Sequence, residues 1–400
     1  PKPQNPVLRR ANRFKLRVSR QMSFSKSGAG QELIINTFEK RNYRMATLRG
    51  IIFGMFGTAL ADTLIWEDQF DSLDFSKWSH EVTLSGGGNW EFEWYSNNRT
   101  NSFVEDGVLY LQPTLTVDNI GDQTLHSGDI NLWGGKYTNE CTSNAFYGCE
   151  RNAAASGNVI NPVQSARIRS AGKFSFKYGK IEIKAQIPKG DFLWPAIWML
   201  PANEAYGGWP SSGEIDIMES RGNDASCAAG GNNKFASTLH WGPAWDANGY
   251  ELTTEQYTHS ESLADDFHIY GLLWSKDRIT TYIDTPDNVV LDVDTSEQSF
   301  WEKGGWTARD NPWAHEKEIN APFNQEFYLI MNVAAGGTNG YFPEGQCGKT
   351  WSDMDPHSVN AFWNSNGAWY PTWDYPATNQ AAMKIDSIQV WELEESAFTQ

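Results

Sequence analysis

Short stretches in which apolar and polar side chains alternate recur along this chain, and they limit its fold more than any other feature. They are separated by Gly, Asn, Asp and Pro, and the clearest are residues 107–112, 180–187, 214–218, 278–284, 327–333 and 383–391. Alternation with period two is typical of strands with one buried face, and frequent turn residues favour antiparallel connections. We therefore predict an all-β fold in which two antiparallel sheets pack face to face as a sandwich. Only residues 253–263 suggest a helical turn or two.

Three stretches are longer than the connections that a compact domain needs. They are residues 136–165, 222–234 and 301–320. Long irregular segments of this kind usually serve as walls or lids of a functional site. We predict that these segments border a cleft on one face of the sandwich.

The N-terminal region has the composition of a leader. Residues 1–44 are rich in arginine and lysine and show no hydrophobic periodicity, and residues 45–61 join a short basic start to an apolar run that ends in Ala-Leu-Ala. This order is typical of a signal peptide, and the run is too short to span a bilayer. We predict that translation starts at Met45, that residues 1–44 are upstream sequence, and that the secreted protein is one domain covering 62–400. An organelle transit peptide is the alternative interpretation.

Charge restricts the ligands of residues 62–400. This part of the chain has 20 basic against 47 acidic side chains, a formal charge of −27. Such a surface repels nucleic acid, anionic membranes and sulfated or uronic-acid polysaccharides, and it favours a neutral or cationic ligand. We therefore expect neither a nucleic acid nor a membrane as partner.

The four cysteines all follow the leader. In an exported protein they can form two disulfides, with three pairings open to them. We expect Cys141 to pair with Cys149, closing a local loop, and Cys227 to pair with Cys347. Their spacing suggests neither a zinc site nor a redox pair.

Three carboxylates crowd into residues 212–220 (SGEIDIMES). Glu214 and Asp216 share one face of a strand, whereas Glu219 would face the other way unless a β-bulge adds one residue at 217–218. Three carboxylates on one face repel each other, which raises at least one pKa. Glycoside hydrolysis uses such a pair, one group ionised and one protonated. The alternative interpretation is a solvated acidic strand face.

Tryptophan is unusually abundant, with 19 residues in the chain. Indole rings offer flat apolar faces on which the C–H face of a sugar ring stacks, although a tryptophan in a sandwich core is the ordinary alternative. The candidates for a sugar-binding groove are Trp90, Trp94, Trp194, Trp198, Trp209 and Trp241.

These motifs resemble a known family. Residues 213–219 (GEIDIME) resemble the active-site signature of glycoside hydrolase family 16, and within it the likeness is greatest to invertebrate laminarinases, which are endo-1,3-β-glucanases. The likeness covers nearly all of 62–395, notably in residues 65–71, 89–101, 173–180, 193–201 and 238–242. It implies a β-jelly-roll sandwich with a substrate cleft on its concave face, formed by a catalytic domain at 62–400.

The resemblance also implies roles for the carboxylates. Glu214 would be the nucleophile and Glu219 the acid/base of a retaining mechanism that passes through a covalent glycosyl-enzyme. Asp216, between them, would hold Glu214 in place and tune its charge. His240 stands where the family has a histidine near the acid/base.

Further residues would bind the sugar chain. Trp194 and Trp198 would stack on sugars on the non-reducing side of the cut, and Trp209 would line the same groove. Asn97 and Arg169 would donate or accept hydrogen bonds at sugar hydroxyls.

The sequence thus predicts a secreted, monomeric endo-β-1,3-glucanase that acts on laminarin-type glucans. Two alternatives share its fold: a β-glucan recognition protein without catalysis, and a transglycosylase that passes the sugar to another sugar. Some glucan sensors of the family lack the catalytic glutamates, which this chain retains. The chemistry requires no cofactor. The family suggests a structural calcium ion, for which Glu67 and Asp386 are candidate ligands.

Overall fold

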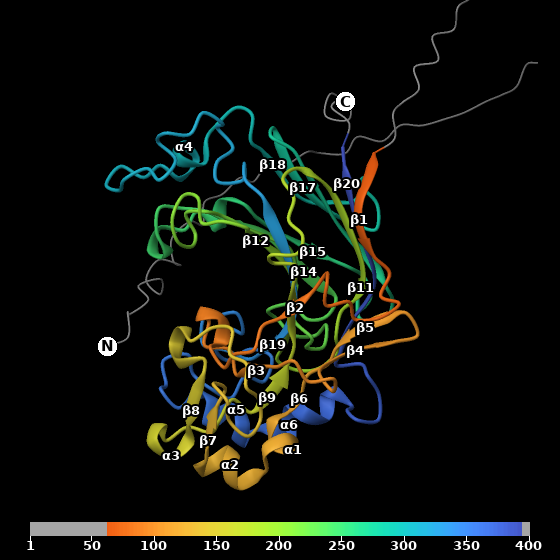
Figure 1. The fold of residues 1–400 in the computed structure, drawn as a ribbon, viewed down its shortest axis with the longest axis vertical. Helices are drawn as coiled ribbons and strands as arrows, with labels where there is room; N and C mark the ends of the chain where they lie inside the picture. The colour runs from red at the N-terminus through yellow and green to blue at the C-terminus, as the bar shows by residue number, and fades with distance from the viewer. Residues whose placement is uncertain (1–61, 394–400) are drawn as a thin grey trace, which may run out of the picture. The chain divides into compact units, whose positions relative to one another are not determined.

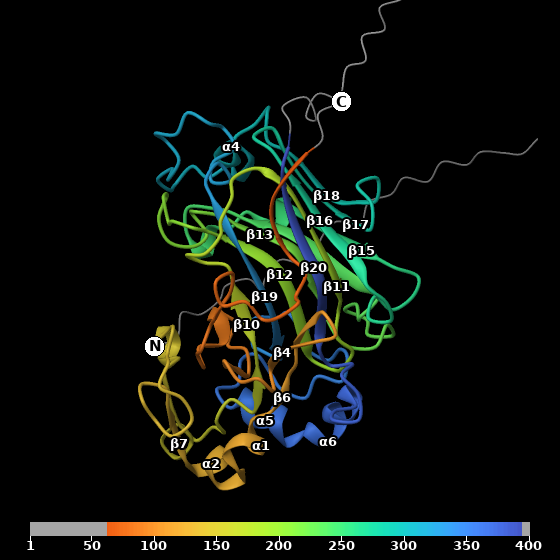
Figure 2. The ribbon, with the colours of Figure 1, turned by 45° about the vertical axis from the view of Figure 1, so that its right-hand side comes forward.

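The computed structural model describes residues 62–393, and its main feature is a pair of antiparallel sheets that face each other (Figure 1). The predicted leader, residues 1–44 and 45–61, lies outside the described residues. The all-β sandwich is therefore confirmed for the part of the chain that carries the alternating segments. Both sheets bend in the same sense, as the turned view also shows (Figure 2).

The outer sheet has eight strands. Seven follow one another in the order β18 (Val289–Asp294), β17 (Arg278–Ile283), β16 (His268–Trp274), β11 (Gly179–Gln186), β20 (Met383–Glu392), β5 (Val108–Leu111) and β4 (Ser102–Glu105). The eighth, β1 (Thr63–Asp68), pairs with β20.

The inner sheet has seven strands. Their order is β15 (Thr254–Thr258), β14 (Lys234–His240), β13 (Glu214–Ser220), β12 (Leu193–Pro201), β19 (Phe327–Ala335), β10 (Arg167–Arg169) and β2 (Ser79–His80). All six segments predicted from alternation lie in strands of the two sheets. The segment 253–263 was wrongly expected to hold a helical turn, because the backbone of β15 pairs with β14 instead.

The core lies between the two sheets. Ile181 and Ile183 of β11 are buried and face inward, while Lys180 and Glu182, which alternate with them, are partly exposed. Ile197 and Met199 of β12 are buried from the other side. Each such side chain contributes about 1.5–3 kcal/mol by leaving water, so the period-two pattern fixes which face of each strand is covered.

A smaller structural layer stands beside the sandwich. It contains β3 (Glu93–Tyr95), β6 (Thr114–Leu115) and β9 (Val163–Ser165), the pair β7 (Asp129–Asn131) and β8 (Glu150–Asn152), and the helices α1 (Thr116–Ile120), α2 (Asp122–Ser127) and α3 (Ala153–Ser156). We call residues 114–162 the insert. A second apolar cluster, which includes Leu125, Ile130 and Trp94, holds the insert in place.

The helices outside the insert are short. α5 (Ser358–Asn364) and α6 (Asn366–Trp369) lie beside it, and α4 (Phe300–Gly304) lies on the opposite side of the molecule (Figure 1). No helix within residues 62–393 has the length and apolar character needed to cross a membrane.

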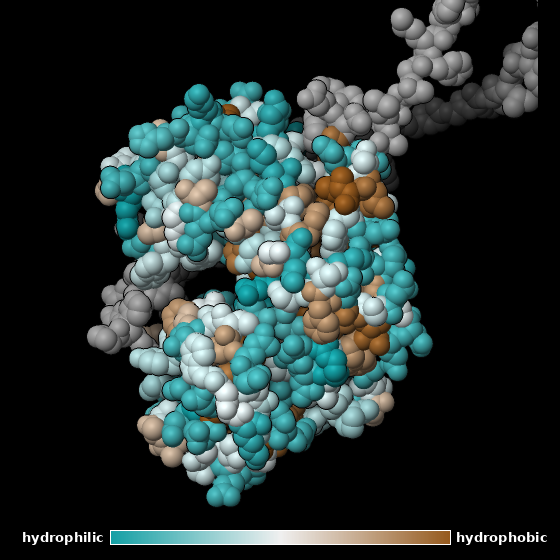
Figure 3. Space-filling model, viewed as in Figure 1, coloured by the Kyte–Doolittle hydropathy of each residue, from teal (hydrophilic) through white to brown (hydrophobic). Residues whose placement is uncertain are grey.

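Both predicted disulfides are present. Cys141–Cys149 closes a loop inside the insert, and Cys227–Cys347 links the β13–β14 connection to the segment after β19. In the space-filling view the molecule is deeply hollowed between the part around α4 and β12 and the part that carries the insert (Figure 3). The predicted long segments at 136–165 and 301–320 belong to these two parts.

Candidate active site

The site is built on β13, which carries the bulge that the sequence predicted. On the β12 side, Met218 is opposite Ile197 and Asp216 is opposite Trp198, so Ile217 is left without a partner. The register with β14 shifts between Asp216 and Glu219 in the same way. A bulge of this kind re-aims the side chains that follow it. It is the reason that Glu219 lies on the same face as the other two carboxyls.

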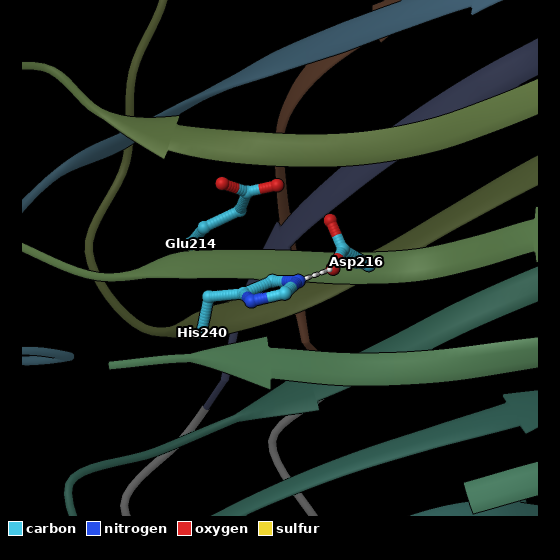
Figure 4. A group of neighbouring side chains, drawn as sticks. All are labelled: Glu214, Asp216 and His240. Atoms are coloured by element: carbon cyan, nitrogen blue, oxygen red, sulfur yellow. Dashed lines mark ion pairs between the residues drawn. The ribbon is translucent and has the colours of Figure 1, made fainter. Parts of the chain in front are cut away.

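Glu214, Asp216 and His240 point to one side of the inner sheet (Figure 4). Glu214 is directly opposite His240 in the register between β13 and β14. Asp216 is only 2% exposed, whereas Glu214 and Glu219 are partly open to solvent. This difference leaves the two glutamates accessible to a ligand and makes the aspartate a supporting group.

Each glutamate accepts a hydrogen bond from an indole N–H. Trp209, in the loop between β12 and β13, donates to Oε2 of Glu214. Trp194, on β12, donates from Nε1 to Oε1 of Glu219 over 2.9 Å. Indole is a donor only, so these contacts favour a carboxyl oxygen that accepts. The two side chains are thereby held at fixed positions on the face of the sheet.

His240 connects β14 to Asp216. Its Nε2 lies 3.1 Å from Oδ2 of Asp216, and its Nδ1 is 2.8 Å from Nδ2 of Asn248. Oδ1 of Asn248 accepts the backbone N–H groups of Trp241 and Tyr250, which fixes the orientation of the amide. The amide N–H therefore donates to Nδ1 of His240, so the neutral imidazole carries its proton on Nε2, the nitrogen nearest to Asp216. Oδ2 of Asp216 lies within ion-pair distance of this nitrogen but accepts no hydrogen bond from the described residues.

The environment raises the pKa of all three carboxyls. Burial, followed by the nearby Asp216 carboxylate, raises the pKa of Glu214 to about 8. Burial also raises the pKa of Glu219 to about 7, with Glu214 adding to the shift. Burial and Glu219 raise the pKa of Asp216 well above its usual range. The group therefore retains at least one proton near neutral pH, which is the charge state that acid catalysis needs.

Trp194 has a different environment from the predicted sugar platform. It is 6% exposed, and one face of its indole stacks on Tyr341 with ring centroids 3.7 Å apart. Because that face is covered and the N–H is bonded to Glu219, Trp194 orients the glutamate instead of offering a free ring. Tyr341 was not found from the sequence, because it lies in a loop more than 120 positions after Glu219.

Trp198 is partly exposed on the same face, in agreement with a place in the groove. Its Nε1 donates to Oδ1 of Asn332 over 2.7 Å, and Nδ2 of Asn332 donates to the hydroxyl of Tyr95. Asn332 is a functional candidate that the sequence reasoning missed. A polar residue in the otherwise apolar segment 327–333 was the available signal.

The two predicted hydrogen-bonding residues do not reach the carboxyls. Arg169, on β10, is three strands away from β13, about 14 Å at the usual strand spacing, and its Nη1 is 3.0 Å from Oε1 of Glu81. Asn97 is exposed in the loop after β3, where its side chain accepts from Arg99. Arg169 therefore faces the more distant part of the inner sheet, and Asn97 has no contact with the site.

Arg167 was also missed. Its guanidinium lies against the ring of Trp198 and contacts Glu81 at 3.3 Å and Glu91 at 3.5 Å. The side chain is nearly buried, and the two carboxylates compensate its charge. A buried arginine held in this way is a rigid part of the groove floor beside Trp198.

Few residues could hold a metal. Within residues 62–393, one set of three ligand types comes together, in which the donor atoms of Glu214, Asp216 and His240 lie within 4.8 Å of one another. Nε2 of His240 lies 3.1 Å from Asp216, and Glu214 already accepts from Trp209, so these side chains already have partners within the protein.

The residues expected to bind calcium do not fit that ion. The carbonyl oxygen of Glu67 accepts the ammonium of Lys77 over 2.7 Å, and Asp386 pairs with Lys184 at 3.2 Å. A lysine beside each candidate ligand already supplies the positive charge. A calcium site at these two positions therefore remains without support from their contacts.

The site has two partly exposed glutamates on a bulged strand of a two-sheet sandwich, and an indole N–H holds each of them. This combination defines the class of β-jelly-roll carbohydrate-active proteins. Comparison with known proteins gives the family. A family model described as glycosyl hydrolases family 16 matches residues 126–303. A β-1,3-glucan-binding protein of Penaeus monodon is 47% identical over 83% of this chain and 91% of its own length. The chain belongs to glycosyl hydrolase family 16.

Two further matches include enzymes. A glucan endo-1,3-β-glucosidase A1 of Niallia circulans is 32% identical over 68% of this chain, which corresponds to 34% of that longer protein. The crystal structure of the laminarinase from Rhodothermus marinus has a TM-score of 0.52 at 24% identity, covering 84% of this chain and 99% of that one. The structural match confirms the jelly-roll fold.

Proposed function

We propose that this protein is a secreted endo-glucanase that hydrolyses β-1,3 bonds of laminarin-type glucans with retention of configuration. The observation that carries the proposal is the pair Glu214 and Glu219 on one bulged strand, each held by an indole N–H and both accessible from the hollowed face. Retaining glycosidases need one carboxylate that attacks and one carboxylic acid that protonates the leaving group.

In the proposed mechanism, Glu214 attacks the anomeric carbon and the proton of Glu219 passes to the departing glycosidic oxygen. A glycosyl-enzyme ester forms at Glu214. Glu219, now a carboxylate, takes a proton from a water molecule while the oxygen of that water attacks the anomeric carbon. The bond between this carbon and Glu214 breaks, which frees the Glu214 carboxylate. Asp216 is a positioning residue, because it is buried between the two glutamates beside His240 and its charge contributes to the raised pKa of Glu214.

Several features support a neutral glucan as substrate. The part of the chain from 62 to 400 carries a formal charge of −27, which opposes binding of sulfated or uronic-acid chains. The relatives from Penaeus monodon and Niallia circulans are both named for β-1,3-glucan. The two disulfides and the signal-like segment 45–61 favour action outside the cell, and we propose a monomer as the acting form.

Glucan recognition without hydrolysis is a second candidate, favoured by the name of the 47% identical relative. The test is release of reducing ends from laminarin by the purified chain, with product lengths followed over time. We expect new reducing ends and progressively shorter chains. Binding of laminarin without any release would support the recognition function, and transfer to longer products would support a transglycosylase.

The pH dependence offers a test of the role of Asp216. Burial is the largest cause of the raised pKa of Glu214, and the carboxylate of Asp216 is the second. The substitution Asp216→Asn removes this second cause. Glu214 must be ionised to attack, so we expect the acidic limb of kcat/KM to move to lower pH, by about one unit. The measurement is a pH profile of kcat/KM on laminarin for parent and variant. A variant with reduced activity but an unchanged acidic limb would show that Asp216 acts only on the structure.

A further inference from the structure

We propose that Trp90, Phe146 and Tyr147 form a second sugar-binding surface, the aromatic rim, which holds the glucan chain where it extends beyond the carboxyl group. The identity of the ligand rests on the proposed function. Trp90 precedes β3, and the other two residues lie on the disulfide-closed loop between β7 and β8. No part of the mechanism described above uses these residues.

The three rings are exposed although each is large and apolar. Trp90 is 44%, Phe146 46% and Tyr147 78% exposed. The rings of Trp90 and Phe146 meet edge to face, with centroids 5.3 Å apart. Large apolar side chains that cluster on the surface commonly mark a binding surface, because exposing them to water does not stabilise the fold.

The backbone holds the rings in a costly conformation. Trp90, Phe146 and Tyr147 have φ values of 55°, 50° and 61°, in the left-handed region that side chains seldom adopt. A residue with a side chain is strained in this region and persists there only where its surroundings determine its conformation. The strained backbone therefore reduces the stability of the fold while it places these three rings at the surface. Stability alone does not explain this arrangement, whereas a binding role does.

The surroundings that fix this conformation are present on both sides. Cys149 closes its loop through the disulfide to Cys141, and Leu84 donates its backbone N–H to the carbonyl of Gly148 over 2.7 Å. The guanidinium of Arg151 donates to the carbonyls of Phe146 and Leu84. These bonds tie the insert to the segment before β3, so the rim is held from two elements.

The rim is continuous with the groove floor. Glu91, the residue after Trp90, contacts Arg167 at 3.5 Å. The guanidinium of Arg167 lies over Trp198, which is opposite Asp216 in the register between β12 and β13. A row of contacts thus leads from the carboxyls across the inner sheet to the rim. In Figure 1 the segments before β3 and between β7 and β8 lie on the insert side of the hollow.

The chemistry of the rim fits an uncharged polysaccharide chain better than a protein. Arg151, the nearby cation, is already bonded to backbone carbonyls, so the rim presents ring faces without a free charge. Three rings are also far fewer than a stable protein interface uses, since such interfaces bury about 1,200 Å² or more in total. A glucan that already occupies the groove needs only this small additional contact.

The experiment compares a long and a short substrate. The rim variant carries Trp90→Ala and Phe146→Ala and so loses one aromatic pair. The control also loses one aromatic pair, through Phe103→Ala and Tyr110→Ala. The control pair stacks at 4.9 Å on β4 and β5 of the outer sheet. We measure kcat/KM on laminarin and on a β-1,3-linked glucose trimer, which offers far fewer sugar units beyond the carboxyls than laminarin does.

We expect the ratio of kcat/KM for laminarin to that for the trimer to fall about tenfold in the rim variant, because the variant loses two apolar ring faces that only the longer chain contacts. The control should keep the parental ratio. An unchanged ratio in the rim variant, or an equal fall in the control, would overturn the proposal.

A binding measurement separates this inference from the proposed function. Calorimetric titration with laminarin in the Glu214→Gln background needs no hydrolysis. Addition of the rim substitutions is expected to weaken Kd about tenfold. If the parent binds laminarin without cleaving it and the rim variant still weakens Kd, the rim stands and the hydrolase function fails. If the parent cleaves laminarin and Kd is unchanged in the rim variant, the hydrolase function stands and the rim proposal fails.

Discussion

Glu214→Gln is expected to lower laminarin hydrolysis by roughly 10⁴-fold or more, because the amide cannot form the glycosyl ester and loss of a nucleophile removes the whole covalent route. The amide oxygen of glutamine can still accept the N–H of Trp209, so the geometry of the site is retained. The measurement is kcat on laminarin, with Trp209→Phe as a control that removes the hydrogen bond and keeps the carboxylate. Residual activity near the parental value would exclude Glu214 as nucleophile.

The same variant has a second readout that a misfolded protein cannot give. The folded state raises the pKa of Glu214 from 4.5 to about 8, so folding binds the proton more tightly. The parent therefore loses stability as pH rises through this window, a loss that glutamine does not share. We expect Glu214→Gln to melt at a higher temperature than the parent at pH 8 and at a similar temperature at pH 4. A lower melting temperature at both values would mean that the substitution damages the fold.

Much of the fold was readable from the sequence, because burial on one face of a strand imposes period two. The bulge on β13 could also be predicted, since only an added residue turns Glu219 to the face of Glu214. Strand β15 was missed because its stability comes from pairing with β14. Edge pairing is a tertiary effect, and the segment's own residues carry no strong alternation.

The site was predictable in its charged groups but not in its supporting contacts. Trp194 was expected to be a sugar platform, yet Tyr341 covers it and its N–H holds Glu219. Asn248 fixes the proton of His240 from a loop that no strand pattern describes. Such contacts join segments far apart in the chain, and a single sequence holds no signal of which loop residue meets which strand.

In the proposed mechanism Glu219 donates a proton, whereas Glu214 attacks as the nucleophile. Substrates whose leaving groups differ in their need for a proton can distinguish these two roles. Glu219→Gln removes the proton that the leaving sugar needs, which is expected to cost about 10²–10⁴-fold on laminarin. A β-1,3-glucosyl substrate with a dinitrophenolate leaving group needs no proton to depart. On that substrate we expect Glu219→Gln to form the glycosyl-enzyme at nearly the parental rate, whereas Glu214→Gln stays inactive.

The second step distinguishes the two roles by stereochemistry. With Glu219→Ala, added azide can attack the ester at Glu214 without general-base help, so two displacements occur and the glycosyl azide retains the β configuration. With Glu214→Ala, azide takes the place of the missing nucleophile in a single displacement, and the product has the α configuration. The measurement is the anomeric coupling constant of the azide product by proton NMR. Interchanged products would reverse the assignment of nucleophile and acid, and azide rescue of neither variant would indicate that these carboxyls bind glucan without cleaving it.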